Sequence, residues 1–142
     1  MPDRLADRYG RILDRAERPG PVAEPIASIF REGKREQLLA GHDARGVPFA
    51  PLRPATLANP RRPAGGPLIP GGPAARLIVE YRVTVSPSAG RLDVSAGWPF
   101  PFVQYLRSGT RKMVARDPGG FRDGDRARAL EVLSDHVHGP DR

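Results

Sequence analysis

Apolar residues recur at helical spacing through the first eighteen residues of the chain. They fall three and four positions apart, with aspartate and arginine between them, which predicts an amphipathic helix. The apolar positions are Leu5, Tyr9, Ile12, Leu13 and Ala16. The sequence Pro19-Gly20-Pro21 should end this helix, because proline removes a backbone donor and glycine is a poor helix former.

A second helix is expected from about Val22 to Ala40. One face would carry Ile26, Ile29, Phe30 and Gln37, and the other the charged residues Arg31, Glu32, Lys34, Arg35 and Glu36. Gly41 follows this helix as its expected C-cap, since glycine readily adopts the left-handed conformation that commonly closes a helix.

Strand patterns begin at Arg76. The run that follows is rich in β-branched residues and partly alternates, with Val79, Tyr81, Val83 and Val85 on one face. Residues 86–90 are typical of a turn, and residues 91–97 then alternate, with Leu92, Val94 and Ala96 facing inward. The two runs predict an antiparallel hairpin over residues 76–97.

An aromatic segment, residues 98–106, comes directly after the hairpin and holds four of the nine aromatic residues. Its prolines exclude a regular helix until about Phe102, after which one short turn is expected. Residues 110–116 are predicted as a further strand. A final helix should run from Asp123 or Asp125 to about Val137. Its expected apolar stripe is Ala127, Leu130, Leu133 and Val137.

Residues 41–73 differ from the rest, since eight prolines and six glycines fall within these 33 residues. So long a segment inside a small domain is functional or disordered, and its scattered apolar residues favour an extended arm that packs against something. The predicted class is therefore α+β: N-terminal helices, a long Pro/Gly-rich arm, a small antiparallel sheet built on a hairpin, and a C-terminal helix. We expect a helical extension at 1–20 and one domain at 21–142 that includes the arm.

Composition narrows the function classes. The 142 residues include no cysteine, which excludes disulfides, a thiol nucleophile and a cysteine zinc site. No apolar run approaches the roughly 18 residues of a membrane span, so we expect a soluble chain. The net charge of +7 fits nucleic-acid binding. A GC-rich genome, which inflates Arg, Ala, Pro and Gly together, explains the same excess.

A search for catalytic residues finds little. His136 and His138 would lie about 200° apart on a helix and could not share a metal there. The paired glycines at 65–66 and 71–72 sit among prolines rather than between a strand and a helix, and no serine has a nucleophile-elbow pattern. We therefore expect no enzyme, and no cofactor or metal.

Two segments have open alternatives. The aromatic segment is either core that covers the open end of the hairpin or a contact surface stiffened by Pro99 and Pro101, with stacking of single-stranded nucleic acid a third interpretation. The basic residues after it are either solvated surface or contacts to DNA phosphates that read no sequence. The candidate DNA-facing residues are Arg107, Arg111, Lys112 and Arg116 after the aromatic segment, together with Arg61 and Arg62 on the arm.

The order of these parts resembles the phage virion-morphogenesis (tail-completion) family and related small neck and minor-tail proteins of tailed phages. The most specific segment is Gly46-Val47-Pro48-Phe49-Ala50-Pro51-Leu52-Arg53-Pro54-Ala55-Thr56-Leu57, followed by Pro67-Leu68 and the hairpin. The sequence Pro101-Phe102-Val103-Gln104-Tyr105-Leu106-Arg107-Ser108-Gly109-Thr110 extends the similarity, which covers roughly residues 22–138.

The resemblance implies a non-enzymatic structural protein of the virion, made in the host cytoplasm and placed at the head–tail junction. Its partners would be copies of itself in a ring, commonly a hexamer, and other neck, connector and tail proteins, with DNA passing through and no membrane involved. The expected subunit or partner contacts are Phe49, Leu52, Leu57 and Leu68 on the arm and Phe100, Phe102 and Tyr105 beside the hairpin. A stand-alone basic nucleic-acid-binding module is the alternative function.

Overall fold

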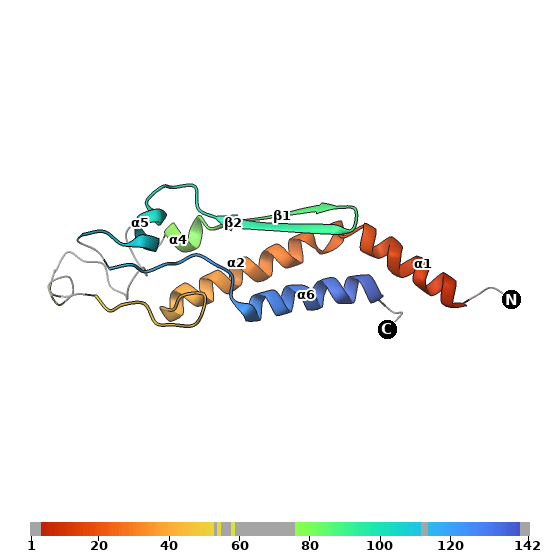
Figure 1. Cartoon of the computed structure of the whole chain (residues 1–142), viewed down its shortest axis with the longest axis horizontal. Coiled ribbons are helices and arrows are strands. Elements are labelled where there is room, and N and C mark those ends of the chain that lie inside the picture. The colour runs from red at the N-terminus through yellow and green to blue at the C-terminus, as the bar shows by residue number, and fades with distance from the viewer. Residues whose placement is uncertain (1–3, 53, 55–57, 59–75, 112–113, 140–142) are drawn as a thin grey trace. The chain divides into compact units, whose positions relative to one another are not determined.

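Helices and one β-hairpin make up the computed structural model, which describes residues 4–52, 54, 58, 76–111 and 114–139 (Figure 1). The elements are α1 (Arg4–Glu17), the 3₁₀ turn η1 (Gly20–Val22), α2 (Ala23–Ala40), α4 (Arg76–Val79), β1 (Arg82–Ser88), β2 (Arg91–Gly97), α5 (Val103–Ser108) and α6 (Asp123–His138). A two-residue turn joins β1 to β2, so the two-stranded sheet is antiparallel. The predicted α+β class is confirmed, and most of the predicted arm lies outside the described residues.

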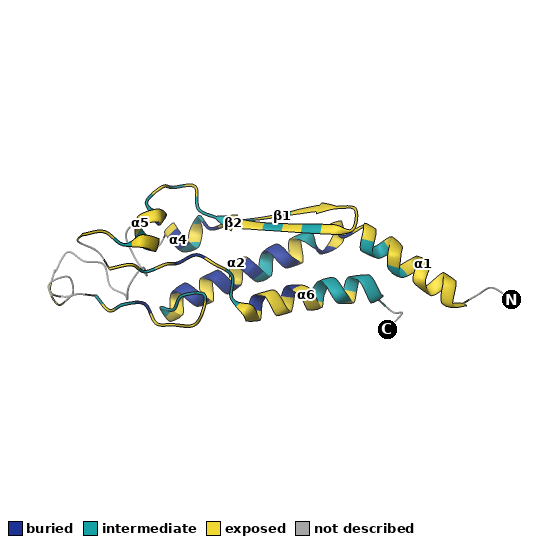
Figure 2. Ribbon diagram, viewed as in Figure 1, coloured by how far each residue is buried: buried dark blue, intermediate teal, exposed yellow. Residues whose placement is uncertain are grey.

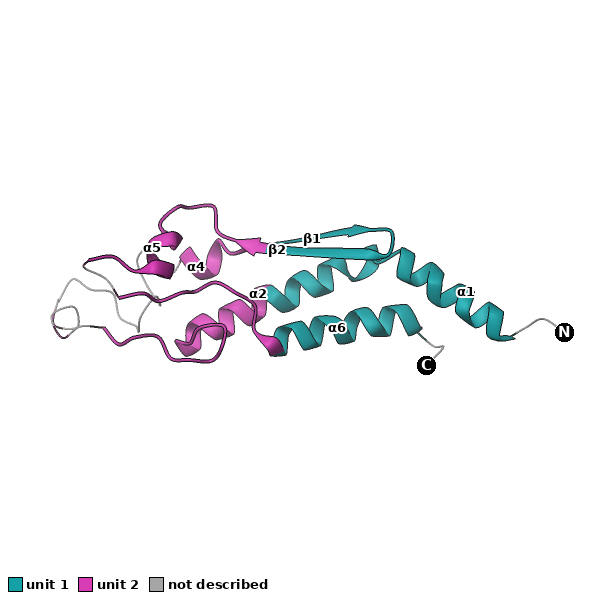
Figure 3. Ribbon diagram, viewed as in Figure 1, with its two compact units in different colours: residues 1–30, 83–95, 124–142 teal, residues 31–82, 96–123 magenta. Residues whose placement is uncertain are grey.

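The chain divides into two compact units (Figure 3). Unit 1 consists of residues 1–30, 83–95 and 124–142, and unit 2 of residues 31–82 and 96–123. Helix α2 and the hairpin contribute to both. Within unit 1, α1 contacts the C-terminal end of α6. There Arg15 donates from Nε to the Val137 carbonyl and from Nη2 to the His138 carbonyl, each at 2.8 Å.

The packing inside unit 1 joins the first half of α2, the hairpin and α6. Ile26, Ala27 and Phe30 are buried on α2, as the helical spacing predicts for the first and last of these. Along β2 the predicted alternation holds at Leu92 and Val94, which are half-buried. It fails at Ala96, which is exposed.

The register of α6 differs from the prediction. Its buried residues are Asp125 and Ala129, whereas Ala127 is exposed and Leu130 is 65% exposed. The small side chain of Ala129 permits a closer approach between packed helices. With Ala129 on the buried face of α6, Ala127 and Leu130 lie on its exposed face. Only the lower part of the predicted stripe, Leu133 and Val137, is half-buried.

The hairpin begins later than predicted, because residues 76–79 form the helical turn α4 rather than a strand. The Glu80 amide donates to the Arg76 carbonyl at 2.8 Å, and the two side chains form an ion pair at 2.9 Å. Leu77 is fully buried while Val79 is 81% exposed. Burial of Leu77 in the core of unit 2 outweighs the β-propensity of its neighbours, which is why the strand prediction was wrong here.

The core of unit 2 closes around the end of α2. Leu38, Phe49, Leu77 and Val103 are buried together, and Ile78, Trp98, Phe100, Phe102 and Leu106 pack against them half-buried. Gly41, with φ of +75°, ends α2 as predicted. Its carbonyl then accepts from the Phe49 amide at 2.8 Å. The intervening turn is held by Asp43, whose Oδ1 accepts from the Arg45 and Val47 amides, both at 2.9 Å.

Lys34 is buried, which corrects its predicted place on the polar face of the second helix. Only 3% of the residue is exposed. Its ammonium donates to the carbonyls of Pro118 at 2.5 Å and Gly120 at 2.9 Å, and to Gln37 Oε1 at 2.9 Å. The rings of Tyr81 and Trp98 lie 5.4 and 5.8 Å from Nζ. These acceptors and rings replace the hydration that burial removes.

The final predicted strand is not found in the described part of residues 110–116. Residues 114–116 have no regular secondary structure. Instead, the Arg116 amide donates to the Leu106 carbonyl at 2.7 Å, which attaches this segment to α5. The short helical turn predicted after Phe102 is confirmed as α5.

We predict that Leu77→Ala lowers the free energy of unfolding by about 2–5 kcal/mol, because it removes a fully buried side chain and leaves a cavity. Urea denaturation of the full chain measures this. The matched control is Val79→Ala, two residues away and exposed, which should stay within about 0.5 kcal/mol of wild type. Equal losses for the two variants would contradict the assignment of α4.

We predict that Lys34→Met lowers the free energy of unfolding by about 2–4 kcal/mol, since it leaves the buried Pro118 carbonyl and the more exposed Gly120 carbonyl without their donor. Arg35→Met on the exposed side of α2 is the control and should change stability by less than about 0.5 kcal/mol. A Lys34→Met chain as stable as the Arg35→Met chain would show that the ammonium contributes nothing to the core.

Candidate functional site: interaction surfaces

The predicted contact residues of the arm that the structure describes differ in their exposure. Phe49 is buried in the core of its own chain at 8% exposure and offers little surface to a partner. Leu52 is half-buried. Leu57 and Leu68 lie outside the described residues. The arm therefore begins as a fixed part of unit 2, held by Phe49 at its root.

The aromatic segment serves mainly as core in the described structure. Phe100 and Phe102 stack with ring centroids 4.6 Å apart and pack half-buried against the core of unit 2. Trp98 donates from Nε1 to the Leu77 carbonyl at 2.8 Å and contacts the Tyr81 ring. Tyr105 differs from the others, because it is 51% exposed on α5. Of the predicted aromatic contacts, Tyr105 presents the largest surface.

The predicted basic residues do not act as a single group. Arg116 donates from Nε to the Ala50 carbonyl at 2.6 Å and from Nη2 to the Pro51 carbonyl at 2.7 Å. Arg107 forms an ion pair with Asp117 at 3.3 Å, and Arg111 is exposed. Arg61, Arg62 and Lys112 lie outside the described residues. Arg116 thus fixes the backbone that follows Phe49, a structural role that its position in the sequence did not indicate.

Helix α1 carries an exposed apolar surface in unit 1. Leu5, Tyr9 and Leu13, which we call the α1 stripe, are each 62% exposed, and no residue of α1 is buried (Figure 2). The sequence predicted both the helix and the stripe from periodicity. It did not predict that the described structure would leave the stripe exposed, since an amphipathic pattern usually marks a face that is packed.

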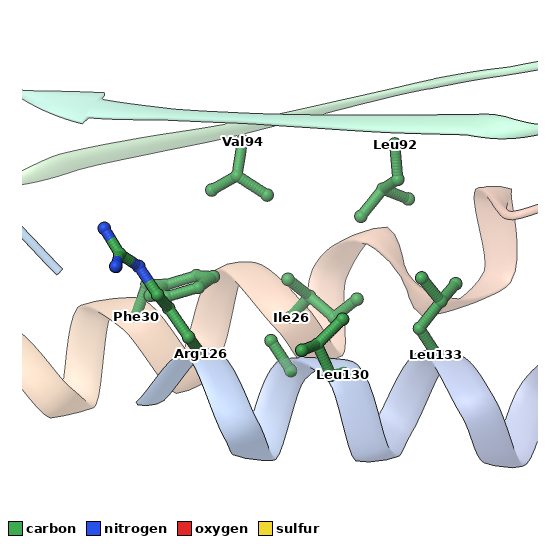
Figure 4. A pocket seen from close by; sticks show the side chains of 8 residues that line it. Ile26, Phe30, Leu92, Val94, Arg126, Leu130 and Leu133 are labelled. Carbon is green, nitrogen blue, oxygen red and sulfur yellow. The ribbon is translucent and has the colours of Figure 1, made fainter. Parts of the chain in front are cut away.

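An apolar groove opens in unit 1 between the hairpin and α6, with α2 as its floor (Figure 4). Its volume is about 310 Å³. The lining residues, which define the unit 1 groove, are Ile26, Phe30, Leu92, Val94, Arg126, Ala129, Leu130 and Leu133. Sequence reasoning missed this groove, because its walls come from three separate segments and no local pattern reports their meeting.

His136, near the end of α6, contacts the end of α1 within unit 1. The Nε2 atom of His136 lies 3.1 Å from the Arg15 carbonyl and 2.9 Å from the Arg18 carbonyl. Because carbonyl oxygens only accept, this nitrogen carries the proton. Within the described part of the chain, no three His, Asp or Glu side chains gather in a way that could hold a metal ion. His136 is therefore interpreted as a tie between α6 and the end of α1.

Among the described helices, none is both long and apolar enough to cross a bilayer. No protein-family model, curated protein or solved structure matches the chain. The α1 stripe, the unit 1 groove and Tyr105 are thus the surfaces from which a function is argued, together with the sequence itself.

Proposed function

We propose that this chain is a structural protein of a tailed-phage virion: a ring-forming tail-completion or neck component that joins the head connector to the tail and lines the DNA passage. The chain would be made in the host cytoplasm and act at the head–tail junction. The virion assignment rests on the resemblance of residues 46–57 and 101–110 to that family.

The observation that carries the assembly part of the proposal is the α1 stripe. Three large apolar side chains at 62% exposure on one helix are costly to hydrate, and contiguous exposed apolar surface marks interaction sites in soluble proteins. Tyr105 adds an exposed aromatic residue of the type enriched at interfaces.

The family-like segment supports the proposal through its role in the chain. Its described part, residues 46–52, places Phe49 in the core of unit 2 and is held there by Arg116. A fixed root of this kind would let the residues beyond it reach a neighbouring subunit. The net charge of +7 suits a lining for DNA of any sequence.

We predict that the purified full chain self-associates into a ring of defined stoichiometry. For the expected hexamer, light scattering after size exclusion should give about 92 kDa, six times the 15.4 kDa chain, and negative-stain images should show closed rings. A short duplex DNA titration over a range of salt concentrations completes the measurement. A chain that stays monomeric and binds the duplex with a steep salt dependence would overturn the proposal in favour of a nucleic-acid-binding module.

A further inference from the structure

We propose that α1 is a releasable helix: polar contacts between the ends of α1 and α6 hold it in place, and their loss frees α1 while the rest of the chain stays folded. The inference goes beyond the proposed ring and does not depend on it. It follows from the way in which two helix C-termini meet within unit 1 (Figure 3).

The last carbonyls of each helix accept hydrogen bonds from a side chain of the other helix. Arg15 of α1 donates to the carbonyls of Val137 and His138 at the end of α6, each at 2.8 Å. His136 of α6 donates from Nε2 to the carbonyls of Arg15 and Arg18 at the end of α1, at 3.1 and 2.9 Å. These contacts, two from each side chain, are called the reciprocal cap below.

The reciprocal cap solves an electrostatic problem. A helix C-terminus ends in carbonyls that have no partner inside the helix, and it carries about half a negative charge. Two such ends repel each other unless donors and cations lie between them. The guanidinium of Arg15 supplies both. Gly139, with φ of +52°, leaves room for this group, since a Cβ at Gly139 would lie 3.3 Å from Arg15 Cζ. The contact between α1 and α6 therefore depends on the cap residues.

Apolar packing contributes little to the attachment of α1. No residue of α1 is buried, and residues 4–11 are all exposed. Ile12 and Ala16 are half-buried near the reciprocal cap. Within unit 1, the first turns of α1 extend beyond the ends of the hairpin and α6 (Figure 1). A segment with so few buried apolar contacts opens at a lower free energy than the core.

The release of α1 has a defined limit at Pro19. Pro19 and Val22 are buried directly after α1 and anchor the chain where α2 begins. Arg18 precedes a proline, a position that disfavours helical backbone, so α1 and α2 do not merge into one helix. Once released, the 14 residues of α1 form a marginal helix in water, so their amides become open to exchange.

The reciprocal cap also sets the direction in which the α1 stripe is presented. Arg15 and His136 are thus positioning residues for that surface. The measurement that tests this role must separate it from a contribution to the stability of the whole chain.

Amide hydrogen exchange of the full chain makes this separation. Arg15→Met keeps a long side chain but removes both donors, so the amides of residues 4–17 should exchange about tenfold faster. Amides around Leu38 and Leu77, in the core of unit 2, should keep their wild-type rates. Arg8→Met, at an exposed position of the same helix, is the matched control and should exchange like wild type.

The other half of the reciprocal cap is tested in the same way. His136→Phe keeps a ring but removes the donor to the two α1 carbonyls, and it should speed exchange over the same residues 4–17. His138→Phe is the control, because the contact of His138 to α1 uses its backbone carbonyl rather than its ring.

The position of α1 can also be measured directly, because the chain has no native cysteine. Nitroxide labels at Asp7→Cys and Glu131→Cys, both exposed in unit 1, report the distance between α1 and α6. Dilution with unlabelled chain restricts the measurement to distances within one chain. Double electron–electron resonance should give a narrow distance distribution for the labelled parent chain and with Arg8→Met added, and a broad one with Arg15→Met.

Three outcomes would overturn the proposal. The first is an Arg15→Met chain whose faster exchange extends equally to the core of unit 2, which would make the reciprocal cap a part of overall stability. The second is a narrow distance distribution with Arg15→Met, and the third is a broad one in the parent chain. Light scattering tests the ring separately, so either idea can fail while the other stands.

Discussion

The buried ammonium of Lys34 holds unit 2 together. It lies on α2 yet donates to the carbonyls of Pro118 and Gly120, which are more than eighty residues away in sequence. The rings of Tyr81, just before β1, and Trp98, just after β2, face the same charge from the open end of the hairpin. A charge in this position tolerates little displacement, because any lost acceptor exposes it to an apolar surrounding. It therefore specifies how these segments meet.

The packing of the aromatic segment, residues 98–106, follows from this arrangement around Lys34. Trp98 contacts the Tyr81 ring and donates to the Leu77 carbonyl, so the chain after β2 is directed onto the core. Phe100 and Phe102 then stack over that core, and the guanidinium of Arg76 lies 4.8 Å from the Phe100 ring centroid. The prolines that made this segment look like a rigid contact surface also suit it to a fixed path across a core. Only Tyr105 keeps an outward position.

Local patterns in the sequence were sufficient to place the helices α1, α2 and α6 and the alternation of β2 at Leu92 and Val94, since period and capping are encoded by neighbouring residues, but they were wrong about Ala96 and about the buried face of α6. These local patterns failed where contacts between residues far apart in the sequence determine the structure. The β-branched run at α4 was predicted as strand because the burial of Leu77 is invisible locally. Lys34 was placed on the polar face because lysine is rarely buried, and its acceptors come from the other end of the chain. The unit 1 groove had no local signal at all.

Both units leave some large apolar side chains exposed, and in unit 1 three of them, Leu5, Tyr9 and Leu13, lie on the single helix α1. Unit 2 packs Trp98, Phe100 and Phe102 into its own core, leaves Tyr105 exposed, and fixes the root of the arm through Phe49 and Arg116. In unit 1 the smaller Ala129 packs inside while Leu130 turns outward, and Tyr9 and Leu13 remain exposed on α1. A helix fixed at its last turn by Arg15 holds its exposed face in a defined direction before any partner arrives. In the proposed assembly, association would order few additional side chains, so more of the apolar burial would contribute to affinity.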